Sequence, residues 1–85
     1  MHKIDYDSLP TITMEEVPKH KLKENCWTVV DGLVYDVTEY IPLHPGGRKI
    51  MLGAGKEASV MFKRHHPGLD LPTSKLSKLC IGRIC

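Results

Sequence analysis

The chain lacks several features that would place it in common classes of protein. It has 85 residues, enough for one domain, and no run of about twenty apolar residues that could cross a membrane as a helix. The N-terminal residues 1–5 do not form the apolar segment of a signal peptide. We therefore expect a soluble protein of the cytoplasm with no membrane anchor in this chain. Residues 1–10 are predicted to be a polar lead-in, and residues 11–85 the domain.

Cysteine and aromatic residues are both scarce. Cys26, Cys80 and Cys85 form no Cys-x-x-Cys-His motif, which excludes a covalently attached c-type haem. Their odd number argues for a reducing compartment, and Cys26 and Cys80 are expected to be buried apolar residues. Aromatic residues make up 6% of the chain, and a domain of this size buries only about 60% of its unfolded surface. A bound apolar cofactor would therefore supply missing core volume.

The N-terminal third predicts a short helix followed by a basic run. Thr13 and Glu16 have the spacing of a capping box, in which each side chain bonds the other's backbone amide. Residues 19–23 form the basic run, which is expected to be a solvated surface with His20 solvated within it. Binding of single-stranded nucleic acid is the alternative, but the run lacks interleaved aromatic residues. We therefore expect no nucleic-acid partner.

A β-hairpin is predicted next. Residues 26–30 and 33–37 are rich in β-branched and aromatic side chains, as strands are. They are joined by Asp31-Gly32, the two-residue signature of a tight hairpin turn.

Short helices and a further strand follow the hairpin. Thr38 is expected to cap a short helix that contains Tyr40 and Ile41. Near the C-terminus, residues 75–80 have helical spacing of apolar side chains and residues 81–84 alternate as a strand does. The predicted fold class is α+β, with a small mixed β-sheet that supports two helical hairpins.

The first of two notable histidines lies on a rigid turn. His44 is followed by Pro45, Gly46 and Gly47. The proline stops a helix at the histidine, and the glycines let the backbone lie close to a planar ligand. A surface turn that contains a histidine is the alternative.

The second histidine follows an aromatic residue at helical spacing. Phe62 and His66 are four residues apart and share one helix face, and Pro67-Gly68 would end the helix just beyond. His65, three residues after Phe62, also has same-face spacing, so spacing leaves both histidines open. Two imidazoles that face each other across a flat apolar ligand suit haem, whereas the alternative is an ordinary helical core with two solvated histidines.

Three motifs together resemble the haem-binding core of the cytochrome b5 family. They are His-Pro-Gly-Gly at 44–47, Ala-Gly-Lys-Glu-Ala at 54–58 and Phe-x-x-x-His at 62–66, and the likeness spans residues 12–84. The four-residue spacing resembles the branch of the family fused into larger redox enzymes. The resemblance implies a non-covalent haem b (iron protoporphyrin IX), with His44 and His66 as iron ligands and His65 as the alternate second ligand. The expected contacts of the haem are Tyr40, Ile41, Gly46, Gly47, Ile50, Met51, Ala58, Phe62 and Leu76.

The resemblance also implies a function. When two imidazoles fill both axial positions, the iron has none left for a substrate. We therefore expect a monomeric electron carrier rather than an enzyme, with a reductase as donor and an acceptor such as a desaturase or hydroxylase. The alternatives are a haem- or steroid-binding module of the membrane-associated progesterone receptor type, which lacks the paired histidines, and a domain with no cofactor or with zinc, for which cysteine partners are missing.

The sequence departs from the family pattern in three places. The segment between Gly47 and Ala54 is one residue shorter than in most relatives. The loop of residues 67–72 is longer, so the family's polar contact to a haem propionate has no match there. Basic residues replace the acidic ones that microsomal relatives carry at the haem edge, and the net charge is +2. An acidic docking face on the partner is therefore predicted. The basic residues are Arg48, Lys49, Lys56, Lys63 and Arg64, and Glu57 is the one acidic residue among them.

Overall fold

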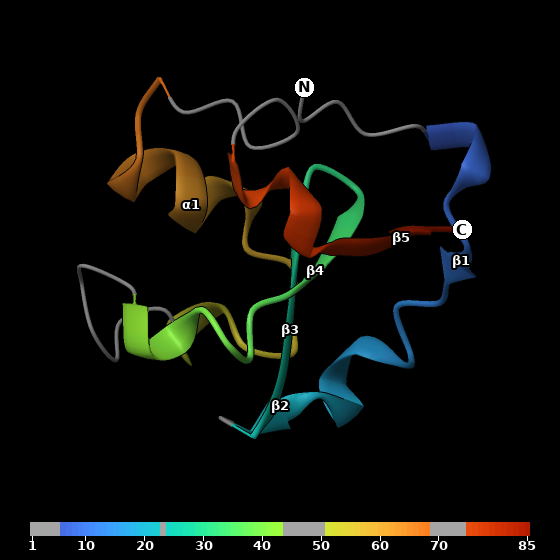
Figure 1. The fold of residues 1–85 in the computed structure, drawn as a ribbon, viewed down its shortest axis with the longest axis horizontal. Helices are drawn as coiled ribbons and strands as arrows, with labels where there is room; N and C mark the ends of the chain where they lie inside the picture. The colour runs from blue at the N-terminus through green and yellow to red at the C-terminus, as the bar shows by residue number, and fades with distance from the viewer. Residues whose placement is uncertain (1–5, 23, 44–50, 69–74) are drawn as a thin grey trace.

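A mixed five-stranded sheet forms the centre of the molecule (Figure 1). The structure is a computed structural model that describes residues 6–22, 24–43, 51–68 and 75–85. The strand order is β1-β5-β4-β3-β2, with β1 parallel to β5 and the other neighbours antiparallel. The strands are β1 (Thr11–Ile12), β2 (Lys21–Leu22), β3 (Asn25–Val30), β4 (Leu33–Asp36) and β5 (Cys80–Ile84).

The predicted hairpin is confirmed as β3 and β4. Val30 pairs with Leu33, so the connection has only two residues. Both have positive φ, 52° at Asp31 and 79° at Gly32, as a two-residue turn of type I′ requires. The turn therefore fixes the register of the two central strands.

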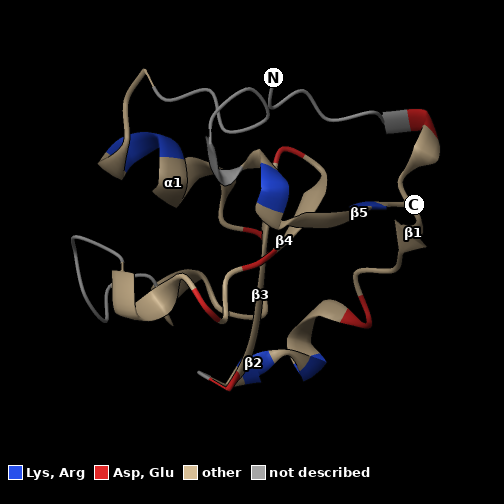
Figure 2. Cartoon of the chain, in the orientation of Figure 1, with Lys and Arg blue, Asp and Glu red and all other residues tan. Residues whose placement is uncertain are grey.

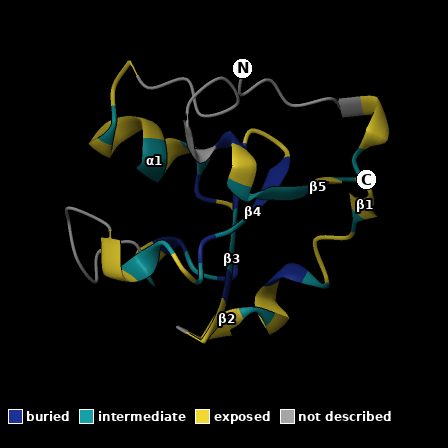
Figure 3. Ribbon diagram, in the orientation of Figure 1, coloured by how far each residue is buried: buried dark blue, intermediate teal, exposed yellow. Residues whose placement is uncertain are grey.

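Alternation along these strands gives the sheet two apolar faces. One face carries Cys26 and Val30 from β3 with Leu33 and Tyr35 from β4, and Val37 joins them just beyond. The other face carries a cluster made by Val17, Val29 and Val34. Figure 3 shows the buried residues concentrated along β3 and β4. Because successive side chains of a strand point to opposite faces, the one hairpin supplies both clusters.

Helices cover the two faces unequally. The one α-helix of the described residues is α1 (Ser59–His65). In Figure 1, α1 and η3 lie on one side of β3, and η2 lies on the other side. The α+β class is confirmed. The short 3-10 helices include η1 (Tyr6–Ser8), η2 (Val17–Lys19), η3 (Ile41–Leu43) and η6 (Lys75–Leu79).

Beyond its pairing with β2, the same edge of β3 holds the segment that leads into α1. The Gly55 amide donates to the Trp27 carbonyl at 2.7 Å, and the Val29 amide donates to the Lys56 carbonyl at 3.1 Å. The Ala58 amide in turn donates to the Val29 carbonyl at 2.7 Å. These bonds tie the start of α1 to the sheet.

Two predicted helix caps are wrong. The capping box does not form, because η2 begins after Glu16 with no side-chain cap and the Glu16 carboxylate accepts bonds from Lys19 and His20 instead. Thr38 does not cap a helix either. Its hydroxyl donates to the Asp36 carboxylate at 2.6 Å and accepts the Cys26 amide at 2.9 Å. Thr38 therefore links the end of β4 to the start of β3 through these two hydrogen bonds.

The C-terminal and N-terminal segments also differ in detail from the expectations. Cys80 is the first residue of β5 rather than the last of a helix, and η6 (Lys75–Leu79) precedes it. Cys26 is fully buried as predicted, whereas Cys80 is half-buried. In the predicted lead-in, Leu9 packs against the core. Within the described ranges, no helix has the length and apolar character needed to cross a membrane.

Candidate functional site

Helix α1 holds one of the two candidate histidine ligands at its C-terminal end. His66 ends the helix with φ −132° and ψ 60°, and its amide still donates to the Phe62 carbonyl at 2.8 Å. Pro67 follows and has no amide N–H to continue the helical bonding. Gly68 has φ 84°, the left-handed conformation that often terminates helices. The predicted end of the helix at Pro67-Gly68 is confirmed.

The adjacent histidines differ in their surroundings. His66 is half-buried, and its ring centroid lies 5.0 Å from that of Phe62 with an interplanar angle of 33°. This separation is within the range of interacting aromatic pairs, so the two rings share one side of the helix end. His65 is exposed. The geometry therefore favours His66 as the residue that faces an apolar ligand.

Phe62 belongs to a set of partly buried apolar side chains on the face of the sheet that α1 covers. These side chains pack against the cluster of Cys26, Val30, Leu33, Tyr35 and Val37 and keep some surface outside it. The set contains Leu9, Tyr40, Ile41, Met51, Ala54, Phe62, Leu79 and Cys80.

Most of the described residues predicted to contact a cofactor lie in this set. They are Tyr40, Ile41, Met51 and Phe62, and Ala58, which is 7% exposed, directly precedes α1. Leu9, Ala54, Leu79 and Cys80 are additional members that are not among the predicted haem contacts. Helical spacing around Leu79 offered a signal for it, but Leu9 lies in the predicted lead-in and nothing in the pattern pointed to it.

The other predicted contacts lie outside the described residues. His44, Gly46, Gly47 and Ile50 fall within residues 44–50, and the side chain of Leu76 is likewise not described. The described chain reaches His44 through η3, which ends at Leu43.

The described residues fit a flat apolar prosthetic group with a nitrogen ligand. The half-buried His66 imidazole lies beside Phe62 at the border of the apolar set, so it could supply a nitrogen ligand next to apolar surface. The Cys26 thiol lies 4.0 Å from the Met51 sulfur, and burial raises its pKa, so it stays neutral and apolar. The described part of the chain contains no group of three or more His, Cys, Asp or Glu that could hold a metal ion.

Basic side chains gather at the C-terminal half of α1, next to His66 (Figure 2). Lys63, Arg64 and His65 are all exposed, and Lys63 donates to the Asp31 carboxylate at 2.9 Å. Positive charge at this end is favourable, because helix C-termini carry partial negative charge. Arg48 and Lys49, predicted to add to this charge, lie outside the described residues.

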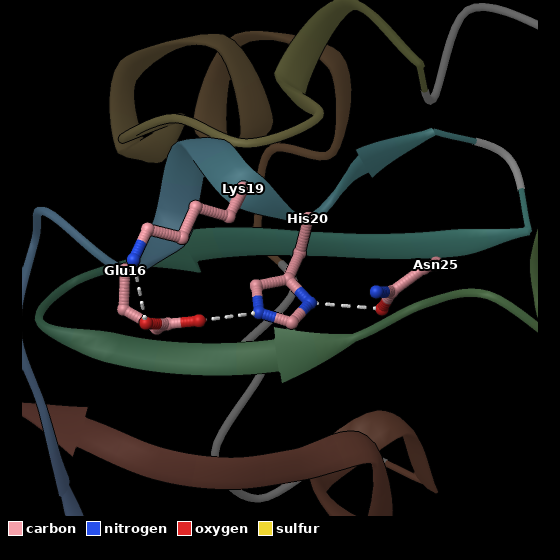
Figure 4. Close-up of polar contacts among 4 residues, drawn as sticks. All are labelled: Glu16, Lys19, His20 and Asn25. Atoms are coloured by element: carbon pink, nitrogen blue, oxygen red, sulfur yellow. Dashed lines mark hydrogen bonds and ion pairs between the residues drawn. The ribbon is translucent and has the colours of Figure 1, made fainter.

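His20 is not the solvated side chain that the basic run predicted. Its side chain is 17% exposed, and its ring stacks on Trp27 with centroids 3.5 Å apart and an interplanar angle of 4°. Figure 4 shows the ring bridging two oxygen acceptors, with Nδ1 2.9 Å from Asn25 Oδ1 and Nε2 2.9 Å from Glu16 Oε2. The bond to Asn25 and that to Glu16 raise the His20 pKa against the effect of desolvation. The same bond to His20 lowers the Glu16 pKa.

Comparison with known proteins identifies the family. The model of the cytochrome b5-like heme/steroid binding domain matches residues 13–85. The chain belongs to the cytochrome b5 family. Among solved structures, cytochrome b5 of Ostreococcus tauri virus 2 is 36% identical with a TM-score of 0.76, over 86% of this chain and 94% of that one. Cytochrome b558 of Ectothiorhodospira vacuolata, a prokaryotic homologue of cytochrome b5, is 34% identical with a TM-score of 0.73, over 91% of this chain and 100% of that one.

Longer relatives carry a similar domain. The Delta(5) fatty acid desaturase A of Dictyostelium discoideum is 46% identical over 70 residues. The match covers 81% of this chain but only 15% of the desaturase. This cytochrome b5 domain is thus similar both to small cytochromes and to one part of a much larger enzyme. At the level of the family, it is a haem-binding domain of electron carriers.

Proposed function

We propose that this domain carries single electrons on a haem b whose iron is bound by His44 on one face and His66 on the other. The observation that carries the proposal is the position of His66, half-buried beside Phe62 at the end of α1 and at the border of the apolar set. Membership of a haem-binding family and the His-Pro-Gly-Gly motif at 44–47 support the same reading. When bound, haem supplies an iron that changes between the ferric and ferrous states.

The residues of the chain hold and shield that group. With His44 and His66 both bound to the iron, no coordination position would remain for a substrate, which would favour electron transfer over catalysis at the metal. Phe62 and Met51 would contribute apolar surface that keeps water away from the group. Because α1 is bonded to the sheet at its start, the helix would hold the His66 imidazole in place.

Haem uptake and reversible reduction test this proposal. The purified chain is titrated with haemin, and the complex is reduced with dithionite and reoxidised while visible spectra are recorded. We expect one haem per chain, six-coordinate low-spin spectra in both oxidation states and full recovery on reoxidation. High-spin spectra, or rapid binding of carbon monoxide to the ferrous form, would show an open axial position and contradict the proposal.

We further propose that the partners are a reductase as donor and a desaturase or hydroxylase as acceptor, with an acidic docking face on the partner. The similarity to a domain of a desaturase supports the acceptor. The exposed Arg64 near His66 supports the charge, because charges around a docking site mainly set the rate of encounter.

A further inference from the structure

The turn between β3 and β4 is bonded to the helix that carries His66. The Asp31 amide donates to the Ser59 hydroxyl at 2.7 Å. The Asp31 carboxylate accepts a bond from the Lys63 ammonium at 2.9 Å. One residue of the turn thus contacts α1 twice, once through its backbone and once through its side chain.

Ser59, the first residue of α1, is also bonded to Glu57. Glu57 accepts the Ser59 amide at 2.7 Å through Oε1 and the Ser59 hydroxyl at 2.5 Å through Oε2. The Ser59 hydroxyl therefore donates to Glu57 while it accepts from Asp31. Because Glu57 also lies in the bridge to Val29 of β3, this chain of bonds runs from the sheet through Ser59 to the turn.

Helix geometry relates these contacts to His66. Ser59 and Lys63 are one turn apart on one face of α1, and Phe62 and His66 are one turn apart on a neighbouring face, about 60° around the axis. Two attachment points along one face resist rotation of the helix about its axis. A rotation of about 10° would move a side chain on the outer surface of the helix by roughly 1 Å.

We propose that Asp31 is a positioning residue for the His66 imidazole, acting through its bonds to Ser59 and Lys63. The proposal rests on the proposed function, in which His66 binds the haem iron. Asp31 itself lies on the turn and is exposed. Its effect on haem is therefore indirect, through the orientation of α1. An exposed ion pair such as Asp31–Lys63 adds little to global stability, so an effect on the ligand can be separated from an effect on folding.

A double-mutant cycle tests the ion pair. Asp31→Asn removes the charge and keeps a residue that tolerates the positive φ of this position, and Lys63→Met removes the ammonium. The low-spin electron paramagnetic resonance spectrum of the ferric protein is recorded, because its g values report the mutual orientation of the axial imidazole planes. We expect each single variant to shift the g values and the double variant to shift them no further. Lys56→Met removes the same charge just before α1 without removing this bond, and should leave the g values unchanged.

Ser59 provides a second test with a conservative rescue. Ser59→Ala removes the acceptor of the Asp31 amide, and Ser59→Thr keeps a hydroxyl. Loss of a bond of this kind is expected to raise the rate of haem transfer to apomyoglobin about five-fold in Ser59→Ala, with most of the effect reversed in Ser59→Thr. In the protein without haem, Ser59→Ala should also speed exchange of the Phe62 and His66 amides with solvent.

The outcomes separate this inference from the proposed function. A wild-type protein without a bis-imidazole low-spin spectrum would refute the proposed ligands themselves. A wild-type protein with that spectrum, whose g values and haem-transfer rate are unchanged in Asp31→Asn and Ser59→Ala, would refute only the positioning role of Asp31. A lower midpoint of thermal unfolding with unchanged g values would likewise show that the turn stabilises the fold without orienting His66.

Discussion

His20 and His66 both lie close to basic residues in the sequence, and the structure gives them different partners. His66 follows Phe62 at helical spacing, and the predicted neighbourhood of the two rings is confirmed. His20 was expected to be solvated but is stacked on Trp27 and bonded at both ring nitrogens. Its partners are Glu16, just before η2, and Asn25 and Trp27 in β3, and only the fold brings them to the same ring. A pattern of neighbouring residues in the sequence could not predict the environment of His20.

Protonation of His20 should be linked to stability. Both ring nitrogens face oxygen acceptors, so the doubly protonated imidazolium satisfies both, and a cation is also favoured over an indole face. Asp36 and Lys19 are the other charged groups that influence the pair, through His20 and Glu16 respectively. Because the folded-state pKa is raised above the ordinary value, His20 contributes stability that is fully present below about pH 6.5 and is lost as pH rises through the folded-state pKa.

Titration of the His20 ring by nuclear magnetic resonance measures this link. We expect a His20 pKa above its ordinary value of 6.5, lowered by Asn25→Leu and, to a smaller extent, by Glu16→Gln. The difference in unfolding free energy between wild type and Asn25→Leu should shrink as pH rises through the His20 pKa. A His20 pKa that neither substitution changes would contradict the role of the two bonds.

The secondary-structure elements show which local sequence patterns predict the fold correctly. The hairpin was predictable because Asp31-Gly32 accepts the positive φ values of the turn and the flanking residues favour strands. The helix caps were not predictable, because Thr38 and Glu16 each have several hydrogen-bonding partners within reach. The local sequence does not determine which of these partners is used. Pairing of residues 55–58 with β3 depends on contacts between residues that are distant in sequence, and no periodic pattern predicted it. The apolar residues around the candidate site were largely predictable, whereas their attachment to the turn at Asp31 was not.

Gly55 should be essential to the packing of the segment before α1. It has φ 69°, and a Cβ there would lie 2.8 Å from Lys21 Cβ and 3.3 Å from Pro18 Cα. Gly32 has φ 79° with nothing within 4 Å of such a Cβ. We expect Gly32→Ala to cost about 1–2 kcal/mol for the left-handed backbone. Gly55→Ala should cost about 1–3 kcal/mol more, because the added methyl group has no space.

Denaturant unfolding of the two alanine variants checks this difference. The comparison holds the backbone penalty nearly constant and isolates the contact with β2 and η2. Equal losses of unfolding free energy in both variants would show that the segment moves away from Lys21 and Pro18 at no cost.

At the scale of the whole molecule, the two faces of the sheet have different roles. The face with Val17, Val29 and Val34 is packed by Ile12, Trp27, Ile81 and Ile84 from β1, β3 and β5. The other face packs α1 and η3 through side chains that stay partly exposed, and it is the face on which we propose that haem binds. Haem binding should therefore stabilise this half of the molecule preferentially, since a ligand that binds only the folded state favours it by mass action.

Amide hydrogen exchange with and without haem tests this division. Without haem, we expect residues 44–72 to be poorly protected and the hairpin Trp27–Val37 to be better protected. Addition of haem should slow exchange mainly in residues 44–72. Equal protection of both regions in the absence of haem would contradict a core that haem completes.

The salt dependence of electron transfer tests the proposed acidic docking face. With an acidic partner, the rate should fall as ionic strength rises, and Arg64→Glu should slow it at low salt. Arg83→Glu changes the same charge on β5 and serves as the control, because Arg83 pairs with β1 rather than lying on α1. Cytochrome c, whose docking face is positive, should react slowly at low salt and faster as salt screens the repulsion. Fastest reaction of cytochrome c at low salt would contradict the proposed charge of the docking face.

The assignment of the two iron ligands is the central claim, and spectra of three alanine variants test it most directly. Haem-reconstituted His44→Ala, His65→Ala and His66→Ala are compared with wild type in the ferric and ferrous states. We predict that His65→Ala keeps the six-coordinate low-spin spectrum, because His65 is exposed, while His66 is half-buried beside Phe62. His44→Ala and His66→Ala should each lose that spectrum. A His66→Ala protein that keeps the low-spin spectrum while His65→Ala loses it would contradict the account.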